Sequence, residues 1–351
     1  MLYLAEATAR ALCADAFGRA GLPPDEAATC TDAVLFASLR GLDSHGIVSV
    51  LPAICRAVSE GRIEPGAAIQ QPGPLVLKGN GAAGPVIGAR TMRVAMGAAR
   101  AQGVGAAVAF NCNHFGAASY YAALALEEGL IGVCACNAGP NVAPYGGAQP
   151  LHGTNPLAYA FPAGDEPPVV LDIATSITAF GQVAKARRRG QTLPPGWALD
   201  ATGQPTTDPA RTTTLLPFGG HKGYGIGVMV DLLTAGLTGS TVGVEVRQGD
   251  NDREHAGQSF FMLAIDPVAF GGAAAFAGRA DALTRQAHAL RPSDGFAEVL
   301  LPGELEHREA QRRRAGGIPL HDEDWAALVR GLDAAGLPGS ALAARHAPRS
   351  G

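Results

Sequence analysis

Two adjacent polar residues are candidates for acid–base chemistry. Ser44 and His45 lie in the segment RGLDSHG, between Gly41 and Gly46, where the chain is expected to turn tightly. Histidine is the side chain best suited to exchange protons near neutral pH, because its unperturbed pKa is about 6.5. The pair therefore predicts a proton-transfer site. The alternative is that Ser44 only caps a helix that begins near Ile47.

His114 is a second candidate for proton transfer. It follows the apolar segment 103–112, which is predicted to be a buried strand, so it lies just beyond the carboxyl end of that strand. Open α/β sheets place their chemistry at that end. His114 could transfer a proton there, or it could be a histidine whose hydrogen bonds are satisfied within the fold.

Lys222 lies in the glycine-dense segment PFGGHKGYGIG, residues 217–227, where an apolar helix is predicted to begin. Backbone amides at the start of a helix, together with one ammonium group, make a binding site for an anion. A cofactor phosphate or a substrate carboxylate would fit, although the spacing is not that of a P-loop. The alternative is that the glycines only allow the helix to pack closely.

The segment GNGAAG, residues 79–84, has the glycine spacing of the dinucleotide-binding fingerprint, after a predicted strand and before a predicted helix. That fingerprint also needs an acidic residue about 20 positions further on to hold the ribose. No Asp or Glu occurs between Gly84 and Leu126. The segment is therefore interpreted as a tight strand-to-helix turn and not as a cofactor site.

Alternating helices and strands must position these segments, which predicts an α/β layer architecture. Helices are predicted at residues 3–20, 25–40, 48–60, 85–102, 117–128 and 223–238, and strands at residues 74–78, 103–112, 131–137 and 259–265. Residues 302–346 are expected to hold a basic helix and a final helix rich in Ala and Leu. Residues 185–220 are expected to form loops, and the basic runs 187–189 and 312–314 to be solvated.

The composition excludes several classes of protein. The 351 residues favour two domains, or one large domain with an appendage. The chain has 27 Lys and Arg against 31 Asp and Glu, and the resulting charge of −4 argues against nucleic acid as a partner. No apolar run reaches the roughly 18 residues that span a bilayer, and the N-terminus lacks the pattern of a signal peptide. The protein is therefore expected to be cytoplasmic, with no membrane partner.

The cysteines, glycines and prolines refine this description. The six cysteines are scattered without metal-ligand spacing, which predicts buried free thiols and no metal site. The 47 glycines and 25 prolines show no Gly-X-Y period. They indicate a turn-rich globular protein whose backbone often adopts positive φ or approaches another group closely.

Seven segments, taken in order, resemble the malate/L-lactate dehydrogenase family of the second, non-Rossmann type. They are RGLDSHG, NCNHFGAASYYA, HGTNPLAYAFP, VLDIATS, LPPGWALDATGQPTTDP, LLPFGGHKGYGIG and LPGELEHRE, and the resemblance covers about residues 3–335. The family includes ureidoglycolate and sulfolactate dehydrogenases and cyclic-imine 2-carboxylate reductases.

The resemblance implies an NAD(P)-dependent oxidoreductase that is usually a homodimer. The implied fold has a non-Rossmann NAD(P)-binding domain, a mixed or antiparallel sheet flanked by helices, at residues 74–299. Both chain ends, residues 1–73 and 300–351, would form a helical domain for substrate binding and dimerisation. The cofactor would be NAD or NADP, with NADPH slightly preferred.

Carried over position by position, the resemblance also implies site residues. His45 and His114 would be catalytic, with Ser44 beside His45, and either histidine could be the acid–base group. Thr154 and Asn155 would face the substrate. The residues implied to bind the cofactor are Asn137, Ala138, Asp172, Ile173, Ala174, His221, Lys222, Gly303, Glu304 and Leu305.

One position departs from the family pattern. Most relatives have an arginine four residues after the histidine of the SHG motif, which binds the substrate carboxylate as a bidentate fork. Here that residue is Ser49. Either another cation takes over, Arg56 being nearest in sequence and Arg40 also possible, or the substrate differs from malate and lactate. Gln182 stands where the cyclic-imine reductases tend to have Asp, which argues mildly against that branch.

Three functions remain open at this point. The first is hydride transfer between nicotinamide and the 2-carbon of a small 2-hydroxy or 2-oxo acid of malate or lactate type, with a histidine exchanging the proton. The second is NADPH-dependent reduction of the C=N bond of a cyclic or N-alkyl imino 2-carboxylate. The third is a non-catalytic relative that binds a ligand, which the missing arginine suggests.

Overall fold

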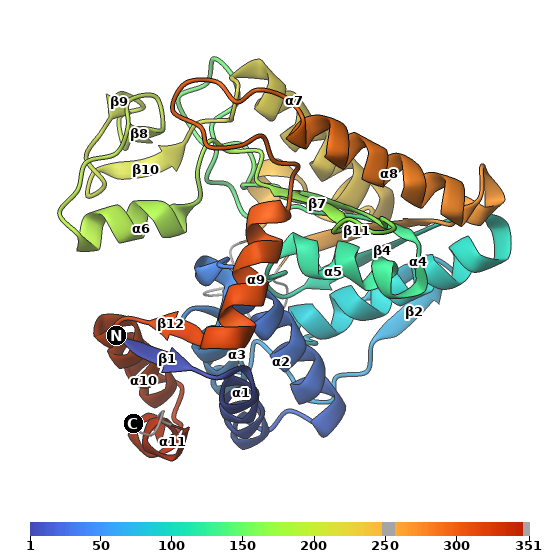
Figure 1. Cartoon of the computed structure of the whole chain (residues 1–351). Coiled ribbons are helices and arrows are strands. Elements are labelled where there is room, and N and C mark those ends of the chain that lie inside the picture. Colours follow the sequence, from blue (N-terminus) through green and yellow to red (C-terminus); the bar gives the residue numbers. More distant parts are fainter. Residues whose placement is uncertain (248–256, 347–351) are drawn as a thin grey trace.

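A seven-stranded mixed sheet forms the centre of the structure, a computed structural model that describes residues 1–247 and 257–346 (Figure 1). From one edge to the other, the strands are β2 (Gln70–Gly73), β3 (Val76–Lys78), β4 (Val104–Cys112), β11 (Gln258–Ile265), β5 (Ile131–Cys136), β6 (Leu157–Phe161) and β7 (Val169–Ile173). β3 and β4 pair in parallel, and the other neighbours pair antiparallel. This sheet confirms the predicted α/β class and the implied difference from a parallel Rossmann sheet.

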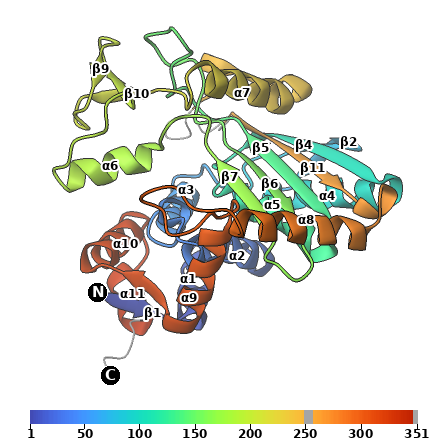
Figure 2. The same ribbon diagram turned by 45° about the horizontal axis from the view of Figure 1, so that its top comes forward.

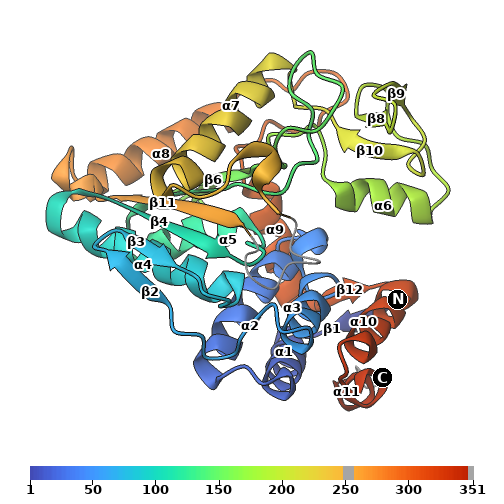
Figure 3. The ribbon, with the colours of Figure 1, turned by 180° about the vertical axis from the view of Figure 1, so that it is seen from behind.

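Helices cover both faces of the sheet (Figure 3). One face carries α4 (Gly84–Gln102) and α5 (Ala118–Leu124), and the other carries α7 (His221–Asp231), its π-helical continuation (Leu232–Gly236) and α8 (Ala273–His288). Strands buried on both faces read as nearly continuous apolar runs. β5, with the sequence IGVCAC, is such a run, and its position was therefore predictable without any polar alternation.

The two chain ends pack together into a second, helical layer. It contains α1 (Glu6–Ala20), α2 (Pro24–Leu39), α3 (Val50–Ser59), α9 (Glu304–Gly316), α10 (Asp322–Ala334) and α11 (Gly339–His346). Leu12, Leu35 and Leu51 from the N-terminal half share one apolar core with Leu328 and Leu342 from the C-terminal half. The implied helical unit built from both termini is therefore present. The exact domain boundaries at residues 73 and 300 stay a prediction.

Several short elements differ from the sequence-based expectation. Residues 2–4 form β1 (Leu2–Leu4), not the start of the predicted first helix, because they pair antiparallel with β12 (Ile318–Leu320). The predicted final helix is two helices, α10 and α11, which a turn at Gly336 separates. β6, β7 and α8 were not predicted. These elements depend on partners far away in sequence, which a local pattern does not record.

A small unit beside the main sheet replaces most of the loop that was expected at residues 185–220 (Figures 1 and 2). It contains α6 (Phe180–Arg188) and a three-stranded sheet, β8 (Ala198–Asp200), β9 (Pro205–Thr206) and β10 (Thr212–Leu215). Its small core includes Val183, Leu193 and Leu215. All six cysteines are buried and unbridged, as predicted. Within the described ranges, no helix has both the length and the apolar character needed to cross a membrane.

Candidate active site

His45 and His114 face each other across the junction of the helical layer and the sheet. His45 ends a short 3₁₀ turn (Asp43–His45) before α3, and His114 lies in the loop after β4. Their rings are stacked, with centroids 6.0 Å apart and 9° between the ring planes. Ser44 Oγ lies 2.9 Å from Nδ1 of His45, so the two neighbours do share a hydrogen bond. The three residues predicted to be catalytic are therefore brought together.

The capping alternative for Ser44 is wrong. α3 begins at Val50, not at Ile47, and no side chain caps it. The backbone N–H of Ile47 donates a hydrogen bond to Ser38 Oγ at 2.8 Å, whereas the hydroxyl of Ser44 forms its hydrogen bond with Nδ1 of His45.

The GNGAAG segment positions the loop that carries His114. It is a strand-to-helix turn between β3 and α4, as the sequence indicated. A Cβ atom at Gly84 would overlap the carbonyl oxygen of His114, so a side chain there is excluded by the loop itself. Asn113 Nδ2 donates to the carbonyls of Gly81 (3.3 Å) and Ala82 (3.0 Å) in the same turn. The glycine cluster thus serves the site through packing.

A cavity of about 420 Å³ opens beside the two imidazoles. It is lined by seven of the predicted site residues: Ser44, His45, Ser49, Arg56, His114, Ala138 and Thr154. Asn141 and Arg62 also line it, and neither was singled out from the sequence. Arg62 lies in the Gly/Pro-rich connection after α3, where no local pattern distinguishes it from a solvated arginine. Only its place on the cavity wall identifies it.

The protein environment disfavours the charged form of both imidazoles. Burial lowers the pKa of His45 below its usual value of 6.5. Burial also lowers the pKa of His114, to about 4, and the neighbouring His45 adds to the effect. Both rings still face the cavity, because His45 is partly exposed and His114 is exposed to it. At neutral pH the pair is therefore uncharged and open to a ligand.

A second cavity, of about 400 Å³, contains three residues implied to bind the cofactor. They are Asp172, Gly303 and Leu305. The carboxylate of Asp172 accepts hydrogen bonds from the backbone N–H (2.8 Å) and the hydroxyl (2.6 Å) of Ser119. Ile173 and Ala174 follow Asp172 along the chain but are not among the residues that line either cavity.

Arg40 lines this second cavity and not the one beside the histidines, so it is not placed to replace the missing substrate arginine. Its guanidinium lies over the ring of Phe36, 3.6 Å from the centroid. Burial and the charge of Arg314 lower the pKa of Arg40 to about 10. Arg40 has no ion-pair partner in residues 1–247 and 257–346.

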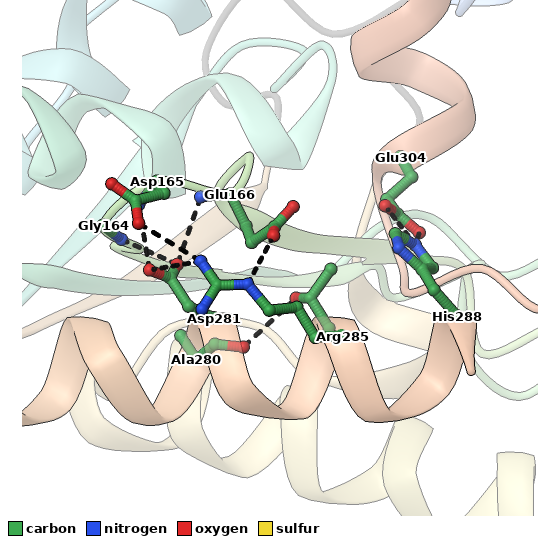
Figure 4. A network of polar contacts seen from close by, with 9 residues as sticks. Gly164, Asp165, Glu166, Ala280, Asp281, Arg285, His288 and Glu304 are labelled. Atoms are coloured by element: carbon green, nitrogen blue, oxygen red, sulfur yellow. Dashed lines mark hydrogen bonds and ion pairs between the residues drawn. The ribbon is translucent and has the colours of Figure 1, made fainter. Parts of the chain in front are cut away.

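Glu304 does not line the second cavity but binds residues next to it. Its buried carboxylate lies 2.9 Å from Nε2 of His288, which links the start of α9 to the end of α8 (Figure 4). It also accepts a hydrogen bond from the backbone N–H of Leu301 at 2.7 Å. Two turns earlier in α8, Asp281 accepts hydrogen bonds from the backbone N–H groups of residues 164–166 (Figure 4). Glu304 thus holds the loop before Gly303, and its implied contact with a cofactor stays a prediction.

Asn137 and Asn155 hold the backbone around the first cavity. Asn137 Oδ1 accepts the N–H of Ser259 at 2.7 Å. Asn155 Oδ1 accepts the N–H of Ala138 at 3.0 Å, and its Nδ2 donates to Gly227 O at 2.9 Å. Both side chains are buried and neither lines the cavity.

His221 and Lys222 begin α7, as the glycine-dense segment predicted, and both are exposed. They are not among the residues that line either cavity. The anion site expected at Lys222 therefore stays a prediction.

The basic run 312–314 is not uniformly solvated. Arg313 is buried, and its Nη1 donates to Ser38 O (2.6 Å) and to Asp43 Oδ1 (2.7 Å). Since Asp43 immediately precedes Ser44, a residue near the C-terminus fixes the turn that carries the Ser–His pair. In the part of the chain that the structure describes, no group of three or more His, Cys, Asp or Glu is placed to hold a metal ion.

Comparisons with known proteins agree with this architecture. A family model described as malate/L-lactate dehydrogenase matches residues 4–329. L-sulfolactate dehydrogenase of Methanocaldococcus jannaschii is 36% identical over 308 residues, which are 86% of this chain and 88% of that protein. Delta(1)-pyrroline-2-carboxylate reductase of Ancylobacter novellus is 34% identical over 346 residues, which are 96% of this chain and 98% of that protein. The solved structure of the Methanocaldococcus jannaschii sulfolactate dehydrogenase has a TM-score of 0.86 and covers 97% of this chain and 99% of its own, at 34% identity.

Proposed function

The chain belongs to the malate/L-lactate dehydrogenase family, and on this basis we propose that it transfers hydride between NAD(P) and the 2-carbon of a small 2-hydroxy or 2-oxo acid. Its relatives are named dehydrogenases and reductases, and the chain is an oxidoreductase. The observation that carries the proposal is the stacked, uncharged pair His45 and His114 on the wall of a ligand-sized cavity.

The residues of the two cavities fit a nicotinamide dinucleotide. Asn141 lines the first cavity, and its buried Oδ1 has no hydrogen-bond partner among the described residues. Such an oxygen is costly to leave unpaired and would accept an N–H of a carboxamide such as that of nicotinamide. In the second cavity, Arg40 would pair with a phosphate. Asp172 and Gly303 would contact the nucleoside from the same cavity.

The protein itself supplies the group that transfers the proton and holds that group in place. When bound, the nicotinamide supplies the hydride. We assign the proton to His114, because neither of its ring nitrogens has a hydrogen-bond partner in the described ranges, whereas in His45 only Nε2 has none, since Ser44 Oγ lies 2.9 Å from Nδ1. The protonated form of His114 donates the proton to the substrate oxygen during reduction, and the neutral form accepts it during oxidation. Burial, with a smaller contribution from the neighbouring His45, keeps His114 uncharged between reactions, and His45 stacks on its ring.

A second candidate function uses the same site on a C=N bond. Its support is the similarity to a pyrroline-2-carboxylate reductase over 96% of this chain. In this case His114 would donate its proton to the imine nitrogen. We also propose that the protein is a cytoplasmic homodimer and that it uses NADPH in preference to NADH.

Cofactor titration and turnover assays test the proposal together. We expect the fluorescence of NADH or NADPH to change on binding, and the nicotinamide absorbance to fall on addition of a 2-oxo acid. Addition of methylamine, or a cyclic imino acid in place of the 2-oxo acid, tests the C=N alternative. Cofactor binding without turnover of any of these compounds would refute both proposed substrate classes, and the absence of cofactor binding would refute all nicotinamide chemistry.

Histidine variants test the role of the pair. His114→Ala should lower kcat by about 10²- to 10⁴-fold, the usual contribution of general acid–base catalysis, and leave cofactor binding intact. His45→Ala should have the smaller effect if His114 carries the proton. The control is His321→Ala, at an exposed position before α10. Wild-type kcat in His114→Ala would remove this residue from the mechanism.

A further inference from the structure

We propose that Arg62 binds the substrate carboxylate, with Arg56 beside it, and that the substrate carries one negative charge and an apolar substituent. The inference rests on the proposed function, because it concerns the substrate of the same cavity. It assigns the anion contact to a residue outside the SHG motif, in the connection between α3 and β2.

Arg62 is held in place before any ligand binds. Its Nε and Nη2 both donate to Oε2 of Glu60, at 2.9 Å and 2.6 Å. The side chain is only 14% exposed, and Nη1 has no partner among the residues that the structure describes. A guanidinium that is fixed along one edge and free on another can bind a planar anion such as a carboxylate. The side chain then loses little conformational entropy on binding.

Arg62 is also tied to the loop of the proton-transfer residue. Asn113 Nδ2 donates to Arg62 O at 3.1 Å, and Asn113 directly precedes His114. One side chain therefore positions the cation and the imidazole relative to each other. A 2-oxo acid needs such a fixed relation, because its carboxylate and its reacting carbonyl are on neighbouring carbons.

Arg56 forms a longer ion pair with Glu60 than Arg62 does. Its Nε lies 3.8 Å from Oε1 of Glu60, and its side chain is half exposed. Glu60 thus lies between two arginines that both line the cavity. We assign the main contact to Arg62 and a supporting one to Arg56, with Glu60 as the positioning residue.

The charges around the cavity match a single carboxylate. No Asp or Glu is among the described residues that line it. The two arginines share one carboxylate partner, Glu60, so one positive charge is left for a ligand. The two imidazoles are uncharged at neutral pH and add nothing. A dianionic substrate would bring a second negative charge without a partner, which is unfavourable in a partly dehydrated cavity.

One part of the wall is apolar. α3 contributes one face to it, and Ile63 and Phe115 add to the same lining. The residues of α3 on this face are Val50, Ala53, Ile54 and Ala57. A substituent beyond the 2-carbon would meet these side chains. The cavity therefore favours an alkyl group or an apolar ring over a second acid group.

Substitution of Arg62 tests the anion contact. In Arg62→Met we expect KM for an apolar 2-oxo monocarboxylate to rise by about 10- to 100-fold, the worth of a charged hydrogen-bonded pair, while kcat changes much less. Arg62→Lys should be intermediate, because it keeps the charge and loses the planar fork. Arg19→Met, which removes a surface arginine paired with Asp15, should leave KM unchanged. An unchanged KM in Arg62→Met would overturn the assignment.

Folding of the variants is checked by cofactor titration. If Arg62→Met does not bind the cofactor, the anion contact is tested with Arg62→Lys and Glu60→Gln instead. Both variants replace the side chain with one of similar size, so they should fold. Arg62→Lys should raise KM more than kcat falls, and Glu60→Gln, which frees a second positive charge, should lower KM for dianions relative to monocarboxylates. Equal KM values in wild type, Arg62→Lys and Glu60→Gln would count against the proposal.

A substrate panel tests the charge and the apolar substituent. Wild type should show a higher kcat/KM for pyruvate, 2-oxobutyrate or 3-methyl-2-oxobutyrate than for oxaloacetate or sulfopyruvate. Ser49→Arg adds a cation on the cavity wall at the other end of α3, and it should improve KM for the two dianions. A wild-type preference for either dianion would refute the proposed substrate class.

Oxamate binding separates an error in the proposed function from an error in the role of Arg62. If wild type binds the cofactor but turns over no compound, the binding of oxamate, an unreactive analogue of a 2-oxo acid, still reports on the anion contact. Oxamate should then bind wild type more tightly than Arg62→Met. Equal binding to both proteins would overturn the role of Arg62 independently of catalysis.

Discussion

The two imidazoles of the cavity differ in what holds them. Nδ1 of His45 is engaged by Ser44 Oγ, whereas the ring of His114 stacks on His45 and has no hydrogen-bond partner in the described part of the chain. His114 can exchange a proton with a ligand through either ring nitrogen, whereas His45 has only Nε2 without a partner among the described residues. Two histidines that look equivalent in the sequence thus receive different roles.

The lowered pKa values predict the pH dependence of turnover. In the oxidation direction His114 must be neutral to accept a proton, so kcat/KM should stay constant as the pH falls until it nears the lowered pKa. The acid limb should therefore lie below pH 6.5, the usual value for histidine. In the reduction direction the protonated form is needed, and kcat/KM should rise as the pH falls. Initial rates over the acid and neutral range measure both limbs.

NMR titration of the His114 ring gives the same information without turnover. In His45→Ala the pKa of His114 should rise, because the neighbouring imidazole contributes to the lowering, although burial contributes more. An acid limb at or above pH 6.5 in wild type would show that His114 is not the titrating base.

At the scale of elements, the turn between β3 and α4 acts as a support for the His114 loop. The free space that a glycine leaves at position 84 is filled by the carbonyl of His114. α4 then begins directly against that loop, with Pro85 in its first turn. The position of the imidazole therefore depends on an element that contributes little of the cavity wall.

Gly84→Ala tests this dependence. The added methyl group must displace the backbone of residues 113–114, which should cost about 1–3 kcal/mol of unfolding free energy, as for an overpacked core. A shift of the imidazole by about 1 Å should also lower kcat by about 100-fold. Thermal or denaturant unfolding and steady-state kinetics measure the two effects.

Gly97→Ala is the matched control on the same helix. No atom lies within 4 Å of the position its Cβ would take. It should leave kcat unchanged and raise the stability by about 0.5–1 kcal/mol, because alanine is the better residue in a helix interior. Full activity in Gly84→Ala would contradict the role of the turn.

At the scale of the whole molecule, the active-site turn is closed by both ends of the chain. Arg313 of α9 reaches Asp43 and the carbonyl of Ser38, and β1 pairs with β12. The site therefore forms only when residues more than 250 positions apart have packed. The division into a helical unit and a cofactor-binding unit stays our proposal, and the shared core of the two ends is its structural support.

We propose that an apolar face of α7 and its π-helical continuation pairs two copies of the chain. Met229, Leu232, Leu233 and Leu237 are each about half exposed, and they recur at the spacing of one helix face. A monomer rarely leaves such a group of large apolar side chains in water. The homodimer implied by the family resemblance would bury it.

Charged substitutions on this face test the dimer. Leu233→Glu combined with Leu237→Glu should convert a dimer into a monomer in size-exclusion chromatography with light scattering, because burial of unpaired carboxylates is unfavourable. Leu75→Glu, an exposed leucine beside β3, should not change the molar mass. A monomeric wild type, or a double variant that stays dimeric, would exclude this face as the interface.

Local sequence patterns predicted most of the longer elements and the type of chemistry. Buried strands such as β4 and β5 are continuous apolar runs, and the glycine turns and helix starts have local signals, so both were predictable. The SHG and NCNHFG segments indicated proton transfer because their residue types and flanking glycines are local properties. The ordered motifs then gave the family.

The tertiary structure decided which of these residues meet. The cavity wall joins α3, the loop after β4 and the loop after β5, and nothing in a local pattern records that Arg62 and Asn141 lie on it while Arg40 lies elsewhere. The burial of Arg313 in an apparently solvated basic run has the same origin. Contacts between segments far apart in sequence form through packing of whole layers, so only the folded chain shows which arginines and which histidines line the same cavity.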